Sequence, residues 1–255
     1  MPWDPAQYLK FAGHRLRPAI DLLSRIDADK PTEVYDLGAG TGNVTRLMKD
    51  RWPDAHVTGV DDSQEMLAKA AAAAPAIDWE RADLATWRPA RRADVIYSNA
   101  ALHWIVGHER LFAELVGALA PAGVLAVQMP RNFSAPSHTS IAEAARSGPW
   151  RARLEPLLRP VPVGEPAFYF DLLAPRVAEL DIWETEYQQV LEGDNPVKEW
   201  TKGTWLTPLL DALAEPERSE FEAAYGALVA RAYPPRADGR TLFPFRRLFI
   251  VARAR

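Results

Sequence analysis

The sequence contains no cysteine among its 255 residues. Disulfides, thiolate metal sites, iron–sulfur clusters and a cysteine nucleophile are therefore excluded. No apolar run approaches the ~20 residues that a membrane-spanning helix needs. The five histidines are scattered without ligand spacing, so no metal site is expected. Residues 1–11 carry an acid and have no apolar segment, unlike a secretory signal, so the expected location is the cytoplasm.

The chain also lacks an excess of positive charge. Its net charge is −4, which gives no general attraction to nucleic acid or to an anionic membrane surface. Neither partner is expected. A hydrophobic content of 48% is enough for a substantial core, and the length fits one large domain that carries insertions.

Short β-rich runs alternate with helical patterns between Val34 and Pro130. This alternation is typical of βαβ units, which build a doubly wound α/β fold with a mostly parallel sheet and helices on both faces. The expected strands are residues 34–37, 56–61, 76–83, 94–100 and 124–129.

The pattern changes after Pro130. Residues 131–175 are rich in proline and aromatics, residues 181–191 alternate like a strand, and the closing segment from Arg247 reads as another strand. A helical face in between carries Phe221, Ala224, Tyr225, Leu228 and Val229. We predict a single domain over 1–255, with a ligand-binding core over 30–130 and helical insertions over 131–180 and 192–244 that cap one end of the sheet.

A glycine-rich turn follows the first expected strand, in the segment EVYDLGAGTGN. Its glycines are Gly38, Gly40 and Gly42, which gives G-x-G-x-G, whereas dinucleotide-binding turns use G-x-G-x-x-G. Asn43 stands where the third glycine of that pattern would be. In a doubly wound fold, a turn at this place lies at the carboxyl ends of the strands, where ligands bind.

Asp36 indicates which ligand this turn accepts. A carboxylate close to a pyrophosphate would cost on the order of a few kcal/mol in a partly desolvated site. S-adenosylmethionine (SAM) has no phosphate and carries two cationic groups, an ammonium and a sulfonium. Asp61 ends the next strand, about 20 residues on, where an acid can bind the ribose hydroxyls. The sequence therefore favours SAM over a nicotinamide cofactor.

Further polar residues follow the next two strands. Asp83, with Leu84 beside it, ends the third expected strand, where a carboxylate can accept a hydrogen bond from the adenine amino group. Asn99 ends the fourth and is expected to orient the methionyl part of SAM. The full set of expected cofactor-binding residues is Asp36, Gly38, Gly40, Gly42, Asp61, Asp83, Leu84 and Asn99.

With these motifs in place, the chain resembles the class I SAM-dependent methyltransferases. The segments WDPAQYLKF, RWPDAHVTGVD, SNAALHW, GVLAVQMP, DIWETEY and RLFIVAR make it similar to the trans-aconitate 2-methyltransferase family in particular. The resemblance implies a seven-stranded sheet with an antiparallel final hairpin. It also implies methylation of one carboxylate of trans-aconitate, with S-adenosylhomocysteine as the second product.

Methylation of a carboxylate needs no general base, because the nucleophile is already ionised at neutral pH. His103 and Trp104 are expected near the transferred methyl group in positioning roles, and the resemblance implies either His or Gln at position 103. A tri-anionic substrate needs arginines, since unpaired buried charge is prohibitive. The candidates are Arg131, Arg247, Arg15 and Arg17.

Three alternatives remain open from the sequence. The first is a methyltransferase for another small carboxylic acid or metabolite. The second is a nicotinamide-dependent oxidoreductase, which Asp36 and the missing third glycine oppose. The third is a SAM-binding protein without catalysis. A nucleic-acid methyltransferase is disfavoured, because no N-P-P-aromatic run follows the fourth strand and the chain is acidic.

Overall fold

The computed structural model describes the backbone of residues 12–255 and the side chains from Leu16 onward. From Leu16 the chain divides into two compact units. The sheet unit comprises residues 16–130, 162–185 and 247–255, and the helical unit comprises residues 131–161 and 186–246. Each unit is described by itself below.

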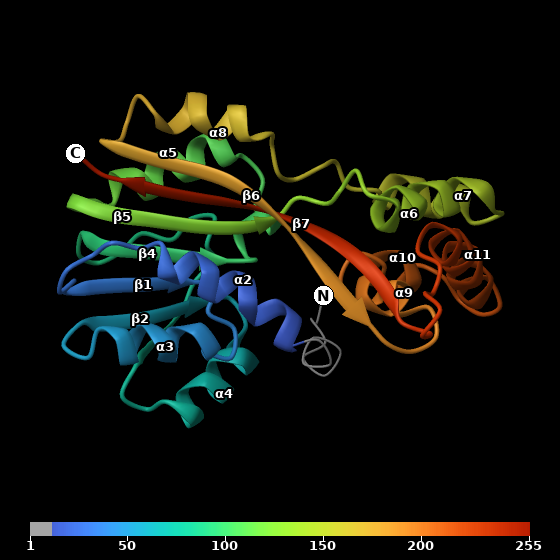
Figure 1. Cartoon of the computed structure of the whole chain (residues 1–255), viewed down its shortest axis with the longest axis horizontal. Helices are drawn as coiled ribbons and strands as arrows, with labels where there is room; N and C mark the ends of the chain where they lie inside the picture. Colours follow the sequence, from blue (N-terminus) through green and yellow to red (C-terminus); the bar gives the residue numbers. More distant parts are fainter. Residues whose placement is uncertain (1–11) are drawn as a thin grey trace. The chain divides into compact units, whose positions relative to one another are not determined.

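A seven-stranded sheet in the order β3-β2-β1-β4-β5-β7-β6 organises the chain (Figure 1). Strands β1 to β5 pair in parallel, and β7 runs antiparallel to β5. The predicted α/β fold with a mostly parallel sheet is thereby confirmed. The strands are β1 (Glu33–Leu37), β2 (His56–Asp61), β3 (Asp78–Arg81), β4 (Ala93–Asn99), β5 (Leu119–Pro130), β6 (Glu179–Leu191) and β7 (Thr241–Arg253).

Helices cover both faces of the sheet unit. The crossovers from β1 to β2 and from β4 to β5 move across the sheet in opposite directions, so right-handed connections put their helices on opposite faces. One face carries α2, where the Tyr97 hydroxyl donates to the Ala19 carbonyl over 2.8 Å. On the other face, His108 bonds the Tyr169 hydroxyl over 2.7 Å. The helices are α2 (Ala12–Ser24), α3 (Asn43–Arg51), α4 (Gln64–Ala73), α5 (His108–Gly117) and α8 (Pro166–Leu173).

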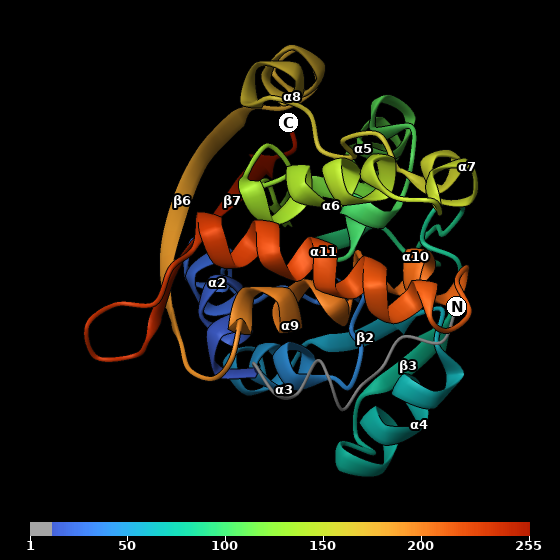
Figure 2. The ribbon, with the colours of Figure 1, turned by 90° about the vertical axis from the view of Figure 1, so that its right-hand side faces the viewer.

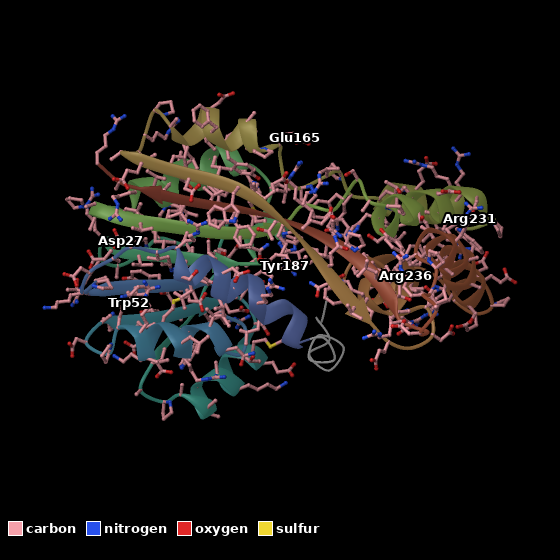
Figure 3. The ribbon with its side chains drawn as sticks, viewed as in Figure 1. Asp27, Trp52, Glu165, Tyr187, Arg231 and Arg236 are labelled. Atoms are coloured by element: carbon pink, nitrogen blue, oxygen red, sulfur yellow. The ribbon has the colours of Figure 1, made fainter. Side chains whose placement is uncertain are left out.

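Local sequence explains where α3 and α4 begin and end. Gly42 adopts the left-handed conformation directly before α3, and Ser63 caps α4 by accepting a bond from the Met66 amide over 3.3 Å. Trp52 ends α3, is 7% exposed and has the Arg51 guanidinium over its ring (Figure 3). Both starts place helix N-termini at the carboxyl edge of the sheet, the edge where the predicted ligand site lies.

The helical unit has its own apolar core. Helices α6 and α11 lie side by side, with α9 next to α11 (Figure 2). Phe221, Tyr225 and Val229 are fully buried, which confirms the predicted apolar face of this helix. The helices and turns are α6 (Pro136–Ser147), α7 (Arg151–Leu154), η2 (Glu155–Leu157), α9 (Pro196–Lys202), α10 (Thr207–Asp211) and α11 (Glu217–Ala232).

Several element boundaries differ from the sequence-based expectation. Strand β7 begins at Thr241, so Arg247 lies inside the strand and the expectation that it starts the strand is wrong. The alternation Thr241, Phe243, Phe245 continues the buried pattern of the strand toward its start, which explains the difference. Strand β3 is shorter than expected at both ends. The division into one core and two cap insertions stays a prediction.

No helix within residues 12–255 is long and apolar enough to cross a membrane.

Candidate functional site

The turn between β1 and α3 exposes glycine backbone. Gly38, Gly40 and Gly42 have φ angles of 79°, 57° and 74°, a region that side chains other than glycine rarely adopt. A Cβ atom at Gly40 would meet nothing within 4 Å, whereas one at Gly38 would lie 2.1 Å from the Ala101 Cβ. Gly40 therefore opens onto space, while Gly38 is closely packed.

Asp36 is buried inside β1 next to this turn. The residue is 3% exposed, and one of its carboxylate oxygens accepts a 2.6 Å hydrogen bond from the Thr45 hydroxyl of α3. Burial raises the pKa of Asp36 to about 7; the Thr45 bond lowers it and the charge of Asp61 raises it. A buried carboxylate with a raised pKa is stabilised in its ionised form by a nearby cation.

Asp61 joins the glycine turn to the start of α4. One of its oxygens accepts from the Gly40 amide over 2.8 Å, and the other accepts from the Ser63 amide over 2.9 Å. Burial raises the pKa of Asp61, while these two bonds lower it. Each carboxylate oxygen can accept a further hydrogen bond, so both can still accept from ligand hydroxyls.

Asp83 and Leu84 lie just beyond β3. Asp83 is exposed, and its Oδ1 accepts from the Ala85 amide over 2.9 Å, which shapes the loop. The half-buried Leu84 contacts the glycine turn, since its Cδ1 would be 3.8 Å from a Cβ at Gly38. The structure thus brings Leu84 to the turn. The expected bond from Asp83 to adenine stays a prediction.

The segment after β4 has an unusual backbone. Asn99 is the last residue of β4, and Ala100 has a φ of 54°, a strained conformation for alanine. Such strain clusters at functional sites. The short helix η1 (Leu102–Trp104) follows, with a buried His103 and a half-exposed Trp104 whose ring centroids are 4.6 Å apart.

The four candidate arginines occupy different environments. Arg247, in the sheet unit, is 3% exposed, and its Nη1 donates to Gln128 Oε1 over 3.1 Å. Arg131, in the helical unit, is half-buried, and its backbone amide donates to the Arg246 carbonyl. Arg17 lies on α2 with an exposed side chain 4.0 Å from Asp21. The side chain of Arg15 lies outside the described residues.

Sequence reasoning missed three residues at this edge of the sheet. Thr45 binds Asp36, and Gln128 binds Arg247. The Trp79 ring covers the turn, because its Cη2 would be 2.3 Å from a Cβ at Gly42. Gly59 pairs with Trp79 across β2 and β3, and a Cβ at Gly59 would lie 2.3 Å from the Trp79 ring. The corresponding sequence signal is a glycine inside an expected strand, which often marks such a close approach. For Gln128 the comparable sequence signal is a glutamine inside the otherwise apolar strand segment VLAVQM.

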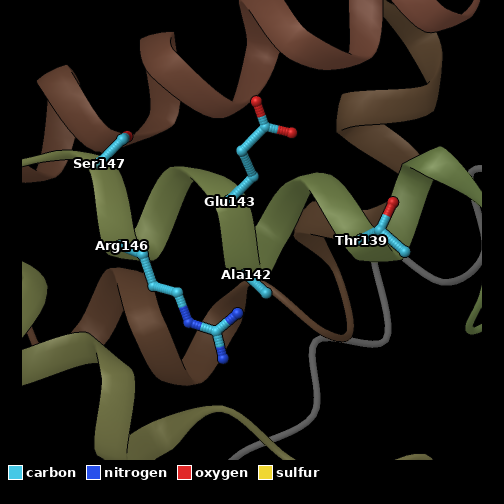
Figure 4. A pocket seen from close by; sticks show the side chains of 5 residues that line it. All are labelled: Thr139, Ala142, Glu143, Arg146 and Ser147. Carbon is cyan, nitrogen blue, oxygen red and sulfur yellow. The ribbon is translucent and has the colours of Figure 1, made fainter.

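The helical unit has a surface hollow that contains no residue of the glycine turn. It lies along α6 and is lined by Thr139, Ala142, Glu143, Arg146 and Ser147 (Figure 4). Arg146 is already paired with Glu155 at 3.1 Å. None of the candidate site residues lines this hollow, so it gives no support for the ligand site.

The residues at the carboxyl edge of β1 and β2 fit SAM. The open backbone at Gly40 leaves space for a ligand chain, and Asp36 and Asp61 are two partly desolvated carboxylates that favour a cation nearby. A pyrophosphate is itself negatively charged and would be repelled by both carboxylates. In the described part of the chain, no group of three or more His, Cys, Asp or Glu side chains is arranged to hold a metal ion.

Comparison with known proteins agrees with this chemistry. The sequence matches the family described as a methyltransferase domain over residues 34–123. It is 50% identical over 250 residues to a trans-aconitate 2-methyltransferase of Azoarcus sp. (strain BH72), covering 98% of each chain. It is 47% identical over 251 residues to the enzyme of that name from Rhodopseudomonas palustris (strain BisB18), again covering 98% of each.

The fold also has solved counterparts. A crystal structure of coclaurine N-methyltransferase, bound to N-methylheliamine and S-adenosylhomocysteine, matches with a TM-score of 0.53 at 12% identity. The match covers 93% of this chain and 70% of that one, and it concerns the fold alone. On the strength of the near full-length relatives, the chain belongs to the trans-aconitate 2-methyltransferase family of SAM-dependent methyltransferases.

Proposed function

We propose that this chain transfers a methyl group from SAM to one carboxylate of trans-aconitate and forms a monomethyl ester. The observation that carries the proposal is the 50% identity, over 98% of both chains, to a relative that bears this activity in its name. The charges of the candidate site agree with it, because acids adjoin the glycine turn and a buried arginine lies in β7.

The cofactor-binding roles follow from the contacts at the glycine turn. Asp36 attracts the ammonium, and Thr45 keeps that carboxylate oriented by its 2.6 Å bond. Asp61 accepts from the ribose hydroxyls while its two backbone bonds hold it in place. Asp83 accepts from the adenine amino group, and Leu84 packs beside the turn.

The substrate-binding role falls on arginine. A guanidinium binds a carboxylate through two parallel hydrogen bonds and remains charged when buried. Arg247 is the foremost candidate because it is buried and therefore acts where water is scarce. Arg131, Arg17 and Arg15 complete the candidate set for a substrate with three negative charges.

The chemical step is a direct displacement. The SAM methyl group passes to a carboxylate oxygen as the sulfur–carbon bond breaks, its electron pair stays on sulfur, and no proton moves. The protein contributes alignment and exclusion of water. His103 and Trp104 position the reactants, and neither acts as a base.

The test is an assay with SAM and a panel of di- and tricarboxylates, read by mass spectrometry. We expect a product 14 mass units above trans-aconitate, one methylene heavier, together with S-adenosylhomocysteine, and much slower reaction with the other acids. An Asp61→Ala variant, expected to weaken SAM binding by ~1–3 kcal/mol, provides the cofactor-site control.

Two outcomes would contradict the proposal. A folded protein that esterifies another acid faster than trans-aconitate would make that acid the substrate. A protein that binds SAM but methylates no member of the panel would be a SAM-binding protein or an enzyme of another acceptor class.

A further inference from the structure

Three polar side chains form a row on one face of the sheet unit. Asn99 of β4 pairs with Gln128 of β5, so both point to the same side. Arg247 of β7 pairs with Pro130, two residues after Gln128, and therefore also points to that side. This is the face of Tyr97, which contacts α2. The three residues are called the polar row below.

Gln128 has an unusual environment within this row. Gln128 is completely buried. Its pairing partner in β7 is Phe249, whose ring stacks on Trp183 with centroids 4.8 Å apart. The row is thus bordered by apolar rings. In such a dry setting each buried polar atom needs a hydrogen-bond partner, because an unmet donor costs about 1–3 kcal/mol.

The contact with Arg247 fixes which way the Gln128 amide points. Arg247 Nη1 lies 3.1 Å from one amide atom, and a guanidinium can only donate. That atom must be the oxygen Oε1. The other amide atom is therefore the NH₂ group, and its nitrogen Nε2 has no hydrogen-bond partner among the described residues.

The unmet donor points to the kind of ligand. An NH₂ group requires an acceptor, and a carboxylate offers only acceptors. A carboxylate placed beside Gln128 would also be next to the positive charge of Arg247. Asp36 of β1 lies on the same face, beyond Asn99. This face therefore passes from positive charge at Arg247 to negative charge at Asp36. The anionic reactant belongs at the Gln128 end.

We propose that Gln128 binds one substrate carboxylate through its side-chain NH₂ group while its oxygen positions Arg247 for the same carboxylate. The proposal rests on the proposed function and extends it by a residue that selects an anionic acceptor. A neutral amide suits this role, since it supplies a donor without a second positive charge that would repel Arg247 or the cationic cofactor.

The test is calorimetry of trans-aconitate binding to protein saturated with S-adenosylhomocysteine. Gln128→Met keeps the side-chain length but removes the donor, and the expected loss of affinity is about 10- to 100-fold, as for a bond to a charged group. Gln128→Glu retains an oxygen for Arg247 but has no donor and adds a negative charge, so it should weaken binding at least as much. S-adenosylhomocysteine affinity should change less than about twofold in both.

Two controls separate binding from a merely structural role. Gln189→Met makes the same change at another buried strand glutamine and should leave affinity unchanged. The second control uses three unsaturated dicarboxylates in which each carboxylate of trans-aconitate is replaced in turn by hydrogen. The loss caused by Gln128→Met should disappear for the one analogue that lacks the carboxylate bound by Gln128.

The results distinguish this inference from the proposed function. If wild type binds trans-aconitate and Gln128→Met binds it equally well, or if the loss is the same for all three analogues, Gln128 is not a substrate ligand. If wild type binds a different carboxylic acid instead, the proposed function fails and the same comparison is made with that acid. If it binds no carboxylic acid, both proposals fail.

Discussion

Asp36 is a buried carboxyl group, 3% exposed, that also feels the negative charge of a second acid, Asp61. Burial raises its pKa to about 7, so near neutrality it exists in both protonation states. If the ionised form attracts the SAM ammonium, cofactor affinity must depend on pH. The hydrogen bond from the Thr45 hydroxyl stabilises the ionised form.

We predict that SAM binding strengthens as pH rises from 6 to 8, by about tenfold for a carboxyl group that titrates near 7. Asp36→Asn should remove this dependence. Thr45→Val should move its midpoint to higher pH, because the bond that lowers the pKa of Asp36 is lost. The measurement is the dissociation constant against pH, taken as the ratio to Asp36→Asn so that titration of the ligand amine cancels. A ratio constant across this range would remove the ionised Asp36 from cofactor binding.

At the scale of elements, the β1–turn–α3 segment decides which ligand the sheet accepts. Three glycines in left-handed conformations turn the chain within a few residues, and the Asp61 carboxylate ties the turn to α4. Gly40 differs from its neighbours because its missing side chain leaves open space. An added methyl group at Gly40 would therefore block ligand space without clashing with the protein, so its effect on binding can be measured apart from its effect on folding.

We expect Gly40→Ala to abolish most SAM binding while lowering stability only by the ~1–2 kcal/mol typical of alanine in the left-handed region. Gly239→Ala is the matched control, because Gly239 has a φ of 80° and likewise nothing within 4 Å of an added Cβ. Both variants should lose similar stability in denaturant unfolding, and only Gly40→Ala should lose SAM. Equal SAM affinity in the two variants would show that the space at Gly40 is not used by the cofactor.

At the scale of the whole molecule, the sequence predicts the fold better than the site. The alternation of strand and helix over residues 34–130 and the glycine turn suffice to predict a doubly wound, mostly parallel sheet, because parallel βαβ units allow few topologies. The buried face of α11 follows from its period. In contrast, the start expected for β7 is six residues too late, although the turn residues Asp238 and Gly239 lie just before Thr241 and the alternation of buried residues begins there.

The polar contacts of the site could not be predicted in the same way. Thr45 lies nine positions after Asp36, and Gln128 lies 119 positions before Arg247, so only the folded sheet brings each pair together. A local pattern carries no information on such a pairing. Asp61 was easier to find, because the end of β2 is always adjacent to the end of β1 in this topology.

The chemical nature of the acceptor determines how the methyl-transfer step responds to pH. A carboxylate with an ordinary pKa of ~4–5 is fully ionised well below neutrality, so no group has to lose a proton for methyl transfer. A hydroxyl or amine acceptor must lose one, and His103 would be the nearby base. Saturation with SAM removes the separate pH effect on cofactor binding.

The most direct measurement is the single-turnover rate against pH for wild type and His103→Gln, with both proteins saturated in SAM and trans-aconitate. For a carboxylate acceptor we expect a rate that is constant between pH 6 and 8.5 and that retains most of its value in the variant. A wild-type rate that rises tenfold per pH unit near 6.5 and is abolished in His103→Gln would contradict it. That result would make His103 a general base and the acceptor something other than a carboxylic acid.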